Sequence, residues 1–249
     1  MQRQTFPHLV HDGAGYPPRS VHAEDLSRMR HVPLLTQLSP NLLGAVLAEA
    51  MVIRYDPGET LFHQGEAPHF LHVVMDGEVC LYGVGSDGNE TVMEIMKCGD
   101  VFIAAAVLTN LPYLMEARAL SSSRVMLLPA ERLRRDLHSI PDLALAMLES
   151  LSSHYRMLVR EVKALKLKST SQRLALYLLS LTPKREGTAI LWLPHSKCVI
   201  SARIGIRPET LSRSFAALQQ YGVQMNATRV SVADLAVLAD FCRQNEDFL

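Results

Sequence analysis

The amino-acid sequence predicts an α+β protein with an N-terminal cupin-like jelly-roll β-barrel, a long dimerisation helix and a C-terminal winged helix-turn-helix. Three observations lead to this prediction. Short apolar runs separated by turn-forming pairs fill residues 51–128, a heptad repeat of apolar residues follows, and two amphipathic helix patterns flank a glycine at position 205. We therefore expect a flexible N-terminal arm, a β-barrel effector domain, the dimerisation helix and the helix-turn-helix domain. Their expected bounds are 1–25, 26–140, 141–168 and 169–249.

The composition is that of an ordinary globular protein. Of 249 residues, 48% are hydrophobic and 20% are charged, and 25 Lys and Arg balance 25 Asp and Glu. This balance argues against a chain that is basic throughout. The charge is uneven, because residues 169–249 contain nine Lys and Arg against six Asp and Glu. Such an excess suits a nucleic-acid-binding part attached to a neutral one.

Cysteine usage and the N-terminus indicate a cytoplasmic protein that does not enter a membrane. No apolar run approaches the ~18 residues of a membrane span, and the polar N-terminus does not resemble a signal peptide. The cysteines form no Cys-x-x-Cys pair, so we expect reduced thiols rather than disulfides. They are Cys80, Cys98, Cys198 and Cys242.

A short helical pattern from Pro40 precedes eight short strands that are expected in the barrel. Asp76-Gly77 and Asp87-Gly88 are strong hairpin signals, because both central residues of such a turn can adopt positive φ. Strands at this spacing favour a jelly roll or barrel. The expected strands are Met51–Arg54, Thr60–His63, Phe70–Met75, Glu78–Gly83, Thr91–Met96, Val101–Ile103, Leu114–Ala119 and Arg124–Leu128.

A short helix (130–138) and a much longer one (141–168) are expected next. The long helix would measure ~42 Å at ~1.5 Å per residue. Its apolar residues recur at alternating spacings of three and four, the heptad pattern of a helix that pairs with another helix. We expect this stripe to join two copies of the chain; the alternative is a core helix that lies on its own barrel. The stripe consists of Leu148, Leu151, Tyr155, Leu158, Val162 and Leu165.

The chain after the long helix predicts a helix-turn-helix. Ser169-Thr170-Ser171 supplies N-cap residues and is expected to be a hinge, followed by a helix (172–181) and a strand (189–193). The segment 197–213 then predicts a first helix, a turn at Gly205 and a second helix that opens at Pro208, where the missing N–H of proline costs nothing.

Three side chains are expected on one exposed face of this second helix. Glu209, Ser212 and Arg213 stand at positions i, i+3 and i+4 near its N-terminus, where major-groove contacts are made. Arg213 can donate two hydrogen bonds to guanine O6 and N7, Glu209 can accept one from a cytosine amino group, and Ser212 can do either. The alternative is a solvated face with an ordinary Glu209–Arg213 ion pair.

Residues around this face are expected to extend a contact with DNA. Residues 223–232 predict a two-stranded wing with Asn226 near its tip, and 235–241 predict a closing helix. Contacts to the DNA backbone are expected from basic and hydroxyl side chains. These are Lys197, Ser201, Arg207, Thr210 and Arg229.

From about Val32 onward, the chain resembles the CRP/FNR superfamily of regulators. The resemblance implies a cytoplasmic homodimeric transcription factor, not an enzyme, whose partners are double-stranded DNA and RNA polymerase. The Glu-x-x-Ser-Arg pattern is similar to FNR-type proteins rather than to the Glu-Thr-Val-Gly-Arg of the cyclic-AMP receptor type, and it implies a TTGAT-like palindrome. The matching residues are Gly65-Glu66 after Phe62, Asp76-Gly77 before Val79, Gly99-Asp100 before Phe102, the long helix, and Arg-Pro-Glu-Thr-Leu-Ser-Arg at 207–213.

The barrel departs from the patterns of two known effector classes. In cyclic-nucleotide binders a Gly-Glu follows the Phe-Ile pair, but three alanines follow Phe102-Ile103 here, and Tyr113-Leu114 stands where an arginine would hold the phosphate. A buried phosphate without a cation is unfavourable, and Arg118 is expected to pair with Glu116. We therefore expect no cyclic nucleotide. No cysteine precedes position 80, which excludes the N-terminal iron–sulfur cluster of oxygen-sensing FNR proteins.

The subgroup that the chain resembles is the DNR-type regulators of nitrate and nitrite respiration. The resemblance rests on 206–213, Leu193-Pro194 with Lys197, 165–168 leading to 177–179, and Pro112-Tyr113. It implies a response to nitric oxide or another diatomic gas through haem, in an apolar pocket lined by Ala104–Leu108, Leu114 and the long helix. Imidazole is the usual ligand in such sensors, and no spacing singles out one histidine. The candidate ligands are His31, His63, His69, His72 and His154.

The expected mechanism has two states. An effector bound in the barrel would shift the paired long helices, and the hinge at 169–171 would turn the DNA-reading helices. Two alternatives remain open. The protein could bind DNA without any cofactor, controlled by abundance or constitutively active, or its winged helix could contact protein instead of DNA.

Overall fold

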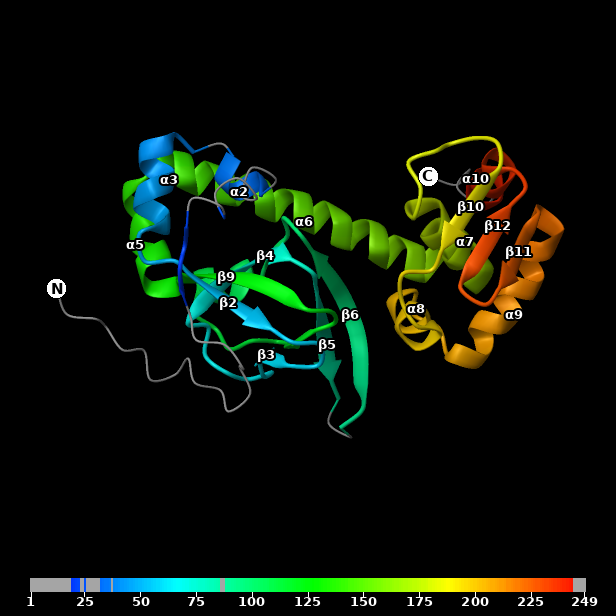
Figure 1. The fold of residues 1–249 in the computed structure, drawn as a ribbon, viewed down its shortest axis with the longest axis horizontal. Coiled ribbons are helices and arrows are strands. Elements are labelled where there is room, and N and C mark those ends of the chain that lie inside the picture. Colours follow the sequence, from blue (N-terminus) through cyan, green and yellow to red (C-terminus); the bar gives the residue numbers. More distant parts are fainter. Residues whose placement is uncertain (1–18, 23–24, 26–31, 37, 86–87, 244–249) are drawn as a thin grey trace. The chain divides into compact units, whose positions relative to one another are not determined.

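The computed structural model describes residues 19–22, 25, 32–36, 38–85 and 88–243. The chain divides into two compact units, Met1–Tyr155 and Arg156–Leu249, and the division lies within helix α6 (Pro141–Leu167) (Figure 1). The sequence predicts boundaries at both ends of this helix instead. The first turns of α6 belong to the first unit because Leu143, Ala146 and Met147 are buried there.

The first unit contains two antiparallel sheets. A five-stranded sheet has the order β1-β2-β9-β4-β7, and a four-stranded sheet has the order β3-β8-β5-β6. The strands are β1 (Arg19–Ser20), β2 (Met51–Tyr55), β3 (Thr60–Phe62), β4 (Phe70–Asp76), β5 (Glu78–Val84), β6 (Glu90–Lys97), β7 (Val101–Phe102), β8 (Glu116–Ala119) and β9 (Ser123–Pro129). All eight expected strands are present with small shifts at their ends, and the predicted fold class is confirmed.

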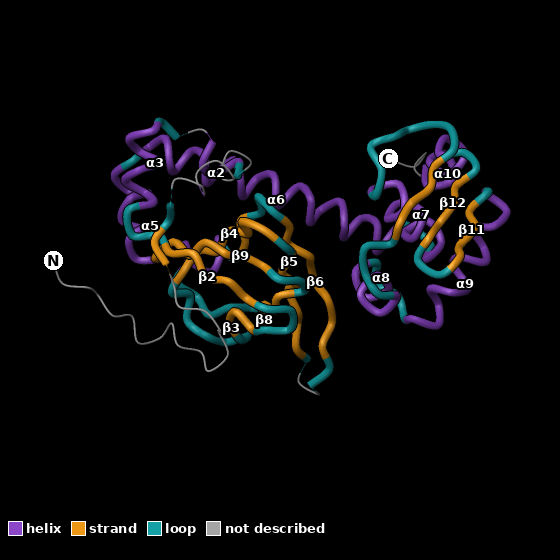
Figure 2. The backbone as a smooth tube through the Cα atoms, in the orientation of Figure 1, coloured by secondary structure: helices purple, strands orange, loops and turns teal. Residues whose placement is uncertain are grey.

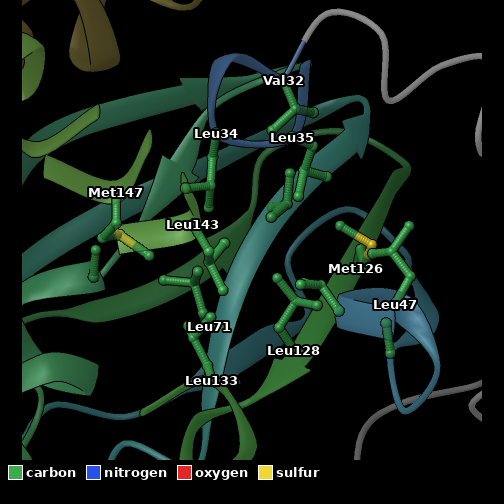
Figure 3. Close-up of a cluster of buried hydrophobic side chains, with 14 of the residues drawn as sticks. Val32, Leu34, Leu35, Leu47, Leu71, Met126, Leu128, Leu133, Leu143 and Met147 are labelled. Carbon is green, nitrogen blue, oxygen red and sulfur yellow. The ribbon is translucent and has the colours of Figure 1, made fainter. Parts of the chain in front are cut away.

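Two apolar layers hold this unit together. The inner faces of the two sheets enclose one layer, in which Val79, Ala117 and Val125 are completely buried. A second layer lies between the other face of the five-stranded sheet and a set of helices, with Leu71 and Leu128 from the sheet meeting Leu143 from α6 (Figure 3). Among the described residues, the helices of this unit are α2 (Pro33–Thr36), α3 (Pro40–Leu47), α4 (Ala104–Thr109), α5 (Ala130–Ser139) and the start of α6.

The turn between β4 and β5 shows why the sequence places a glycine there. Gly77 has φ of +78°, and a Cβ at this position would lie 2.4 Å from the carbonyl oxygen of Ser122. A side chain would therefore meet backbone that cannot move aside easily, in addition to the unfavourable φ. The Asp76-Gly77 pair thus allows both the tight turn and the close approach of a neighbouring loop.

The end of the expected N-terminal arm is part of the barrel. Arg19 and Ser20 pair with Val52 and Met51 at the edge of the five-stranded sheet. Asp25 is buried, and its carboxylate accepts hydrogen bonds of 2.7 and 2.9 Å from the Arg19 guanidinium and a further one from Arg124. Isolated polar residues such as these carry no periodic signal, which is why the sequence did not reveal the attachment. Residues 1–18 lie outside the described part of the chain.

The second unit is a small winged-helix fold. Its three-stranded antiparallel sheet has the order β10-β12-β11 (Figure 2) and packs one face on the helices through Leu191, Val230 and Val232. Its elements are α7 (Thr170–Ser180), β10 (Ala189–Trp192), α8 (Lys197–Arg203), α9 (Pro208–Leu218), a 3-10 turn (Gln219–Tyr221), β11 (Val223–Asn226), β12 (Arg229–Val232) and α10 (Leu235–Arg243). Ser169 caps α7 with a reciprocal capping box to Gln172.

Two helices were not expected from the sequence. Helices α2 and α4 are only four and six residues long, too short to show a periodic pattern. Among the described helices, none combines the length and the apolar character that crossing a bilayer requires.

Candidate nucleic-acid interface

The first helix of the helix-turn-helix is α8. The Ser196 side chain accepts a hydrogen bond from the Val199 N–H at 3.4 Å and so caps the helix. Ile200 is fully buried in the core of the second unit, which fixes the face of α8 that packs inward. Lys197 is exposed at the N-terminus of α8, as a contact to a DNA backbone requires.

The turn that follows depends on Gly205. Its φ is +66°, and a Cβ there would lie 2.6 Å from a methyl carbon of Leu165. The chain reverses through backbone hydrogen bonds from Gly205 N–H to the Ala202 carbonyl (3.0 Å) and from Ile206 N–H to the Ser201 carbonyl (2.9 Å). Pro208 then occupies the first turn of α9, where its ring fits helical φ.

Helix α9 presents the three expected side chains to solvent. Leu211, Phe215 and Leu218 are buried on one face. Glu209, Ser212 and Arg213 are all exposed on the other, in its first two turns. Within the described residues, neither the Glu209 carboxylate nor the Arg213 guanidinium has an ion-pair partner. The ordinary intrahelical Glu209–Arg213 pair, which was the alternative interpretation, is therefore not formed.

The residues expected to contact the DNA backbone differ in exposure. Arg207 is exposed and Thr210 is half-buried beside Glu209, so both lie next to the reading face. Ser201 is only 1% exposed, and its hydroxyl donates to the Cys198 carbonyl at 2.9 Å. The prediction that Ser201 contacts DNA is wrong, because the hydroxyl satisfies the helix backbone from inside the fold.

The wing is present and Arg229 is at its tip. β11 and β12 pair with Asn226 opposite Arg229, and Ala227 takes a left-handed φ of +53° in the turn between them. Asn226, Thr228 and Arg229 are exposed. The wing therefore offers one cation and two neutral polar side chains at one end of its sheet.

The heptad stripe of α6 is mostly uncovered in the single chain. Leu148 is 61% exposed, and Tyr155, Leu158, Val162 and Leu165 are also exposed. Leu151 differs, because it is half-buried against the core of the first unit. A row of large apolar side chains in water is unfavourable, so this stripe is the apolar surface in the described chain that most clearly lacks a cover.

The barrel interior holds His72 inside an aromatic cluster. Its ring centroid lies 5.0 Å from that of Phe62 and 5.2 Å from that of Phe102, and Tyr113 lies 4.1 Å from Phe62. Burial lowers the pKa of His72 to about 3, although the Phe70 backbone opposes the shift. His72 is therefore neutral at physiological pH and closely packed by rings.

His63 lies in a charge network on the outer face of the four-stranded sheet. Its Nδ1 is 2.8 Å from a Glu116 carboxylate oxygen, and Arg118 donates to Glu116 and to Glu90 at 2.5 and 2.9 Å. Burial raises the pKa of Glu116, but the His63 and Arg118 hydrogen bonds outweigh it and hold that pKa below its usual value. Ala117, between Glu116 and Arg118, faces the interior instead. Arg118 thus faces away from the inside of the barrel, as the expected pairing with Glu116 requires.

The other candidate haem ligands and the expected pocket are placed as follows. His154 is on α6 with its side chain 38% exposed, and its Nε2 lies 3.8 Å from a Glu94 carboxylate oxygen of β6. His69 is exposed, and His31 lies outside the described residues. Leu114, expected to line an apolar pocket, is 84% exposed. The expectation for Leu114 is wrong, because the chain turns outward after Tyr113. The segment 104–108, which was expected to line the same pocket, forms helix α4.

Trp192 is a surface residue that was not among the predicted site residues. Along β10 the residues alternate between buried and exposed, with Ala189 and Leu191 inward and Ile190 and Trp192 outward. This period of two is visible in the sequence. It could have shown that the tryptophan faces away from the core.

Comparison with known proteins agrees with this architecture. Residues 52–139 match the family described as Cyclic nucleotide-binding domain, and residues 172–241 match the Crp-like helix-turn-helix domain. A solved structure from Ruegeria pomeroyi DSS-3, a candidate cyclic nucleotide binding protein, is 32% identical with a TM-score of 0.61; the match covers 89% of this chain and 99% of that one.

Two further relatives match most of the chain. Transcriptional activator protein FnrA of Stutzerimonas stutzeri is 26% identical over 212 residues, which cover 82% of this chain and 85% of FnrA. The structure of DNR from Pseudomonas aeruginosa is 26% identical with a TM-score of 0.50, over 90% of this chain and all of that one. The chain therefore belongs to the CRP/FNR superfamily of DNA-binding transcriptional regulators, which are not enzymes.

Proposed function

We propose that the protein binds a TTGAT-like palindrome as a homodimer, with Glu209, Ser212 and Arg213 reading the bases of each half-site. The observation that carries this proposal is the exposed, unpaired Glu209 and Arg213 on the first turns of α9. An acid beside DNA phosphates is repelled, so an unpaired Glu209 is better explained by a hydrogen bond from a cytosine amino group. Arg213 supplies the complementary pair of donors for guanine.

A two-fold assembly supports the same proposal. Two copies of the exposed α6 stripe can cover each other as a coiled coil does. Such a dimer would present two α9 helices to successive turns of a palindrome. We propose RNA polymerase as a further partner.

A binding titration tests the DNA-reading proposal. We expect labelled TTGAT-palindrome duplex to bind the protein far more tightly than a scrambled duplex, and Arg213→Ala to lose ~1–3 kcal/mol per half-site and the preference for guanine. The control is Arg243→Ala, which removes an exposed arginine of α10 that pairs with Asp240 at 3.5 Å. Equal affinity of Arg213→Ala and Arg243→Ala for both duplexes would contradict the proposal. It would favour the alternative of a winged helix that contacts protein.

For the first unit we propose a response to nitric oxide or another diatomic gas through haem. The support is the resemblance to DNR-type regulators together with His154. His63 is engaged by Glu116, and His72 is enclosed by rings, so neither fits an iron without rearrangement. His154 is half-exposed on α6, and its ion pair with Glu94 is long. Haem iron would supply the affinity for the gas, and His154 would hold the iron beside the dimerisation stripe.

We do not propose a cyclic nucleotide as the effector, because Arg118 is committed to Glu90 and Glu116 on the outer face of the sheet. An absorption spectrum after haem addition tests the haem proposal. We expect a Soret band that shifts with nitric oxide and is weakened in His154→Ala but not in His69→Ala. A protein that takes up no haem, yet binds the palindrome at full affinity, would favour regulation without a cofactor.

A further inference from the structure

The outer face of the sheet in the second unit exposes large apolar side chains. Trp192 is the only tryptophan of the chain, and it is 65% exposed; Ile190, two residues before it, is 56% exposed. Tryptophan is highly buried in most proteins, so an exposed one beside an exposed isoleucine needs an explanation. β10 is also an edge strand, and it carries no charge or proline that would protect it.

The register of the strands places Trp192 in one row with the wing tip. Trp192 lies opposite Arg229, and Arg229 lies opposite Asn226, so the three exposed side chains share the outer face. The Leu193 N–H donates to the Thr228 carbonyl at 2.8 Å, which ties the end of β10 to the wing turn. Ser196, the cap of α8, follows four residues after Trp192. Trp192 is therefore continuous with the proposed DNA-contacting surface.

The charge around this face suits a polyanion. Residues 187–232 contain five basic residues and one acid, and the acid is Glu209 of the reading helix. The outer face itself combines Arg229 with neutral side chains (Ile190, Trp192, Gln224, Asn226 and Ser231) and carries no acid. A DNA backbone is a polyanion and is attracted by this one-sided charge, whereas a neutral protein partner would not require it.

We propose that Trp192 and Asn226 extend the backbone contact expected of Arg229, so that the row Trp192–Arg229–Asn226 holds the sugar–phosphate backbone outside the half-site read by α9. The inference rests on the proposed DNA binding by α9 and adds a contact that does not read bases. The flat indole can cover a deoxyribose while its N–H donates to a phosphate oxygen, and the adjacent guanidinium neutralises that charge. In protein–DNA complexes, contacts to the DNA backbone generally position the protein, and contacts to bases select the sequence.

The single tryptophan gives a direct test, because all indole fluorescence reports on this site. We expect the emission of Trp192 to change when a palindromic duplex with long flanks binds, and to stay unchanged with a duplex trimmed to the palindrome. Trp192→Ala should weaken binding to the long duplex by about tenfold, at every palindrome sequence, and leave binding to the trimmed duplex unaltered. The matched control is Ile190→Ala, on the same strand and face but one row away from the wing tip, which should bind like the wild type.

The outcomes separate this inference from the DNA-reading proposal. If the wild type binds the long palindrome selectively but Trp192 emission and the affinity of Trp192→Ala are unchanged, the second contact is refuted and reading by α9 stands. If the wild type binds no duplex, both are refuted. If Trp192→Ala binds both duplexes like the wild type but binds RNA polymerase more weakly, the row contacts a protein and the DNA contact is overturned. Trp192→Phe should retain most of the binding, since the ring still covers the sugar.

Discussion

Replacing Leu148 by alanine should weaken the dimer while changing the stability of the single chain little. Leu148 begins the exposed stripe of α6 and is 61% exposed in the protomer. Burying a leucine completely is worth ~1.5–3 kcal/mol, so covering the part that is exposed here is worth ~1–2 kcal/mol. A two-fold interface contains the residue twice, which gives ~2–4 kcal/mol per dimer. At ~1.4 kcal/mol per tenfold change, the dimer dissociation constant should rise ~30- to 700-fold.

Leu167→Ala is the matched control for this experiment. Leu167 is 58% exposed on the same helix, but it follows the stripe residue Leu165 by two positions, about 200° around a helix of 3.6 residues per turn. Sedimentation equilibrium of both variants and the wild type measures the dissociation constants. Equal constants for Leu148→Ala and Leu167→Ala would refute the assignment of the seam, and so would a wild type that stays monomeric at micromolar concentration.

Three further predictions concern the first unit. Gly77→Ala should lower the midpoint of thermal unfolding far more than Gly58→Ala, because both have positive φ but only the Cβ at 77 would meet backbone, at 2.4 Å; equal shifts would contradict the close approach. Burial lowers the pKa of His72 to about 3 in the folded state. As pH falls below ~6.5, the imidazole therefore takes up a proton in the unfolded state but not in the folded state. Wild-type stability should decline by ~2 kcal/mol from pH 7 to pH 5 relative to His72→Phe, measured by urea unfolding, and parallel pH profiles would refute the neutral buried imidazole. Burial would raise the pKa of Asp25, but hydrogen bonds and charges from Arg19, His22 and Arg124 bring it to about 2. The ionised carboxylate therefore stabilises the folded protein above pH ~4, and this stabilisation is lost as pH falls toward 2. Asp25→Asn should destabilise the protein at pH 7 but not at pH 2.

The strands and long helices follow from the sequence because their signals are local. The Asp76-Gly77 turn, the heptad stripe and the Pro208 helix start each depend on residues within one or two turns of the chain, and the structure has them where expected. The Asp87-Gly88 turn lies partly outside the described residues. Arg213 could be predicted as exposed because Leu211 and Phe215 fix the inward face of the same helix.

The features that the sequence did not reveal depend on contacts between distant residues. Asp25 is buried with Arg19 and with Arg124 as partners, and Arg124 follows some hundred positions later. Ser201 looked available for DNA, but its hydroxyl bonds to the helix backbone. Leu114 is apolar yet exposed, because Tyr113 beside it takes the place in the aromatic cluster.

Binding to modified DNA tests the base-reading role of α9 most directly. Guanine in each TTGAT half-site is replaced by 7-deazaguanine, which lacks the N7 acceptor, and the affinities of the wild type and Arg213→Ala are measured for both duplexes. The proposed contact predicts that the modified base weakens the wild type by about tenfold or more per half-site and has no further effect on Arg213→Ala. An equal loss in both proteins would show that the Arg213 guanidinium does not bind this guanine.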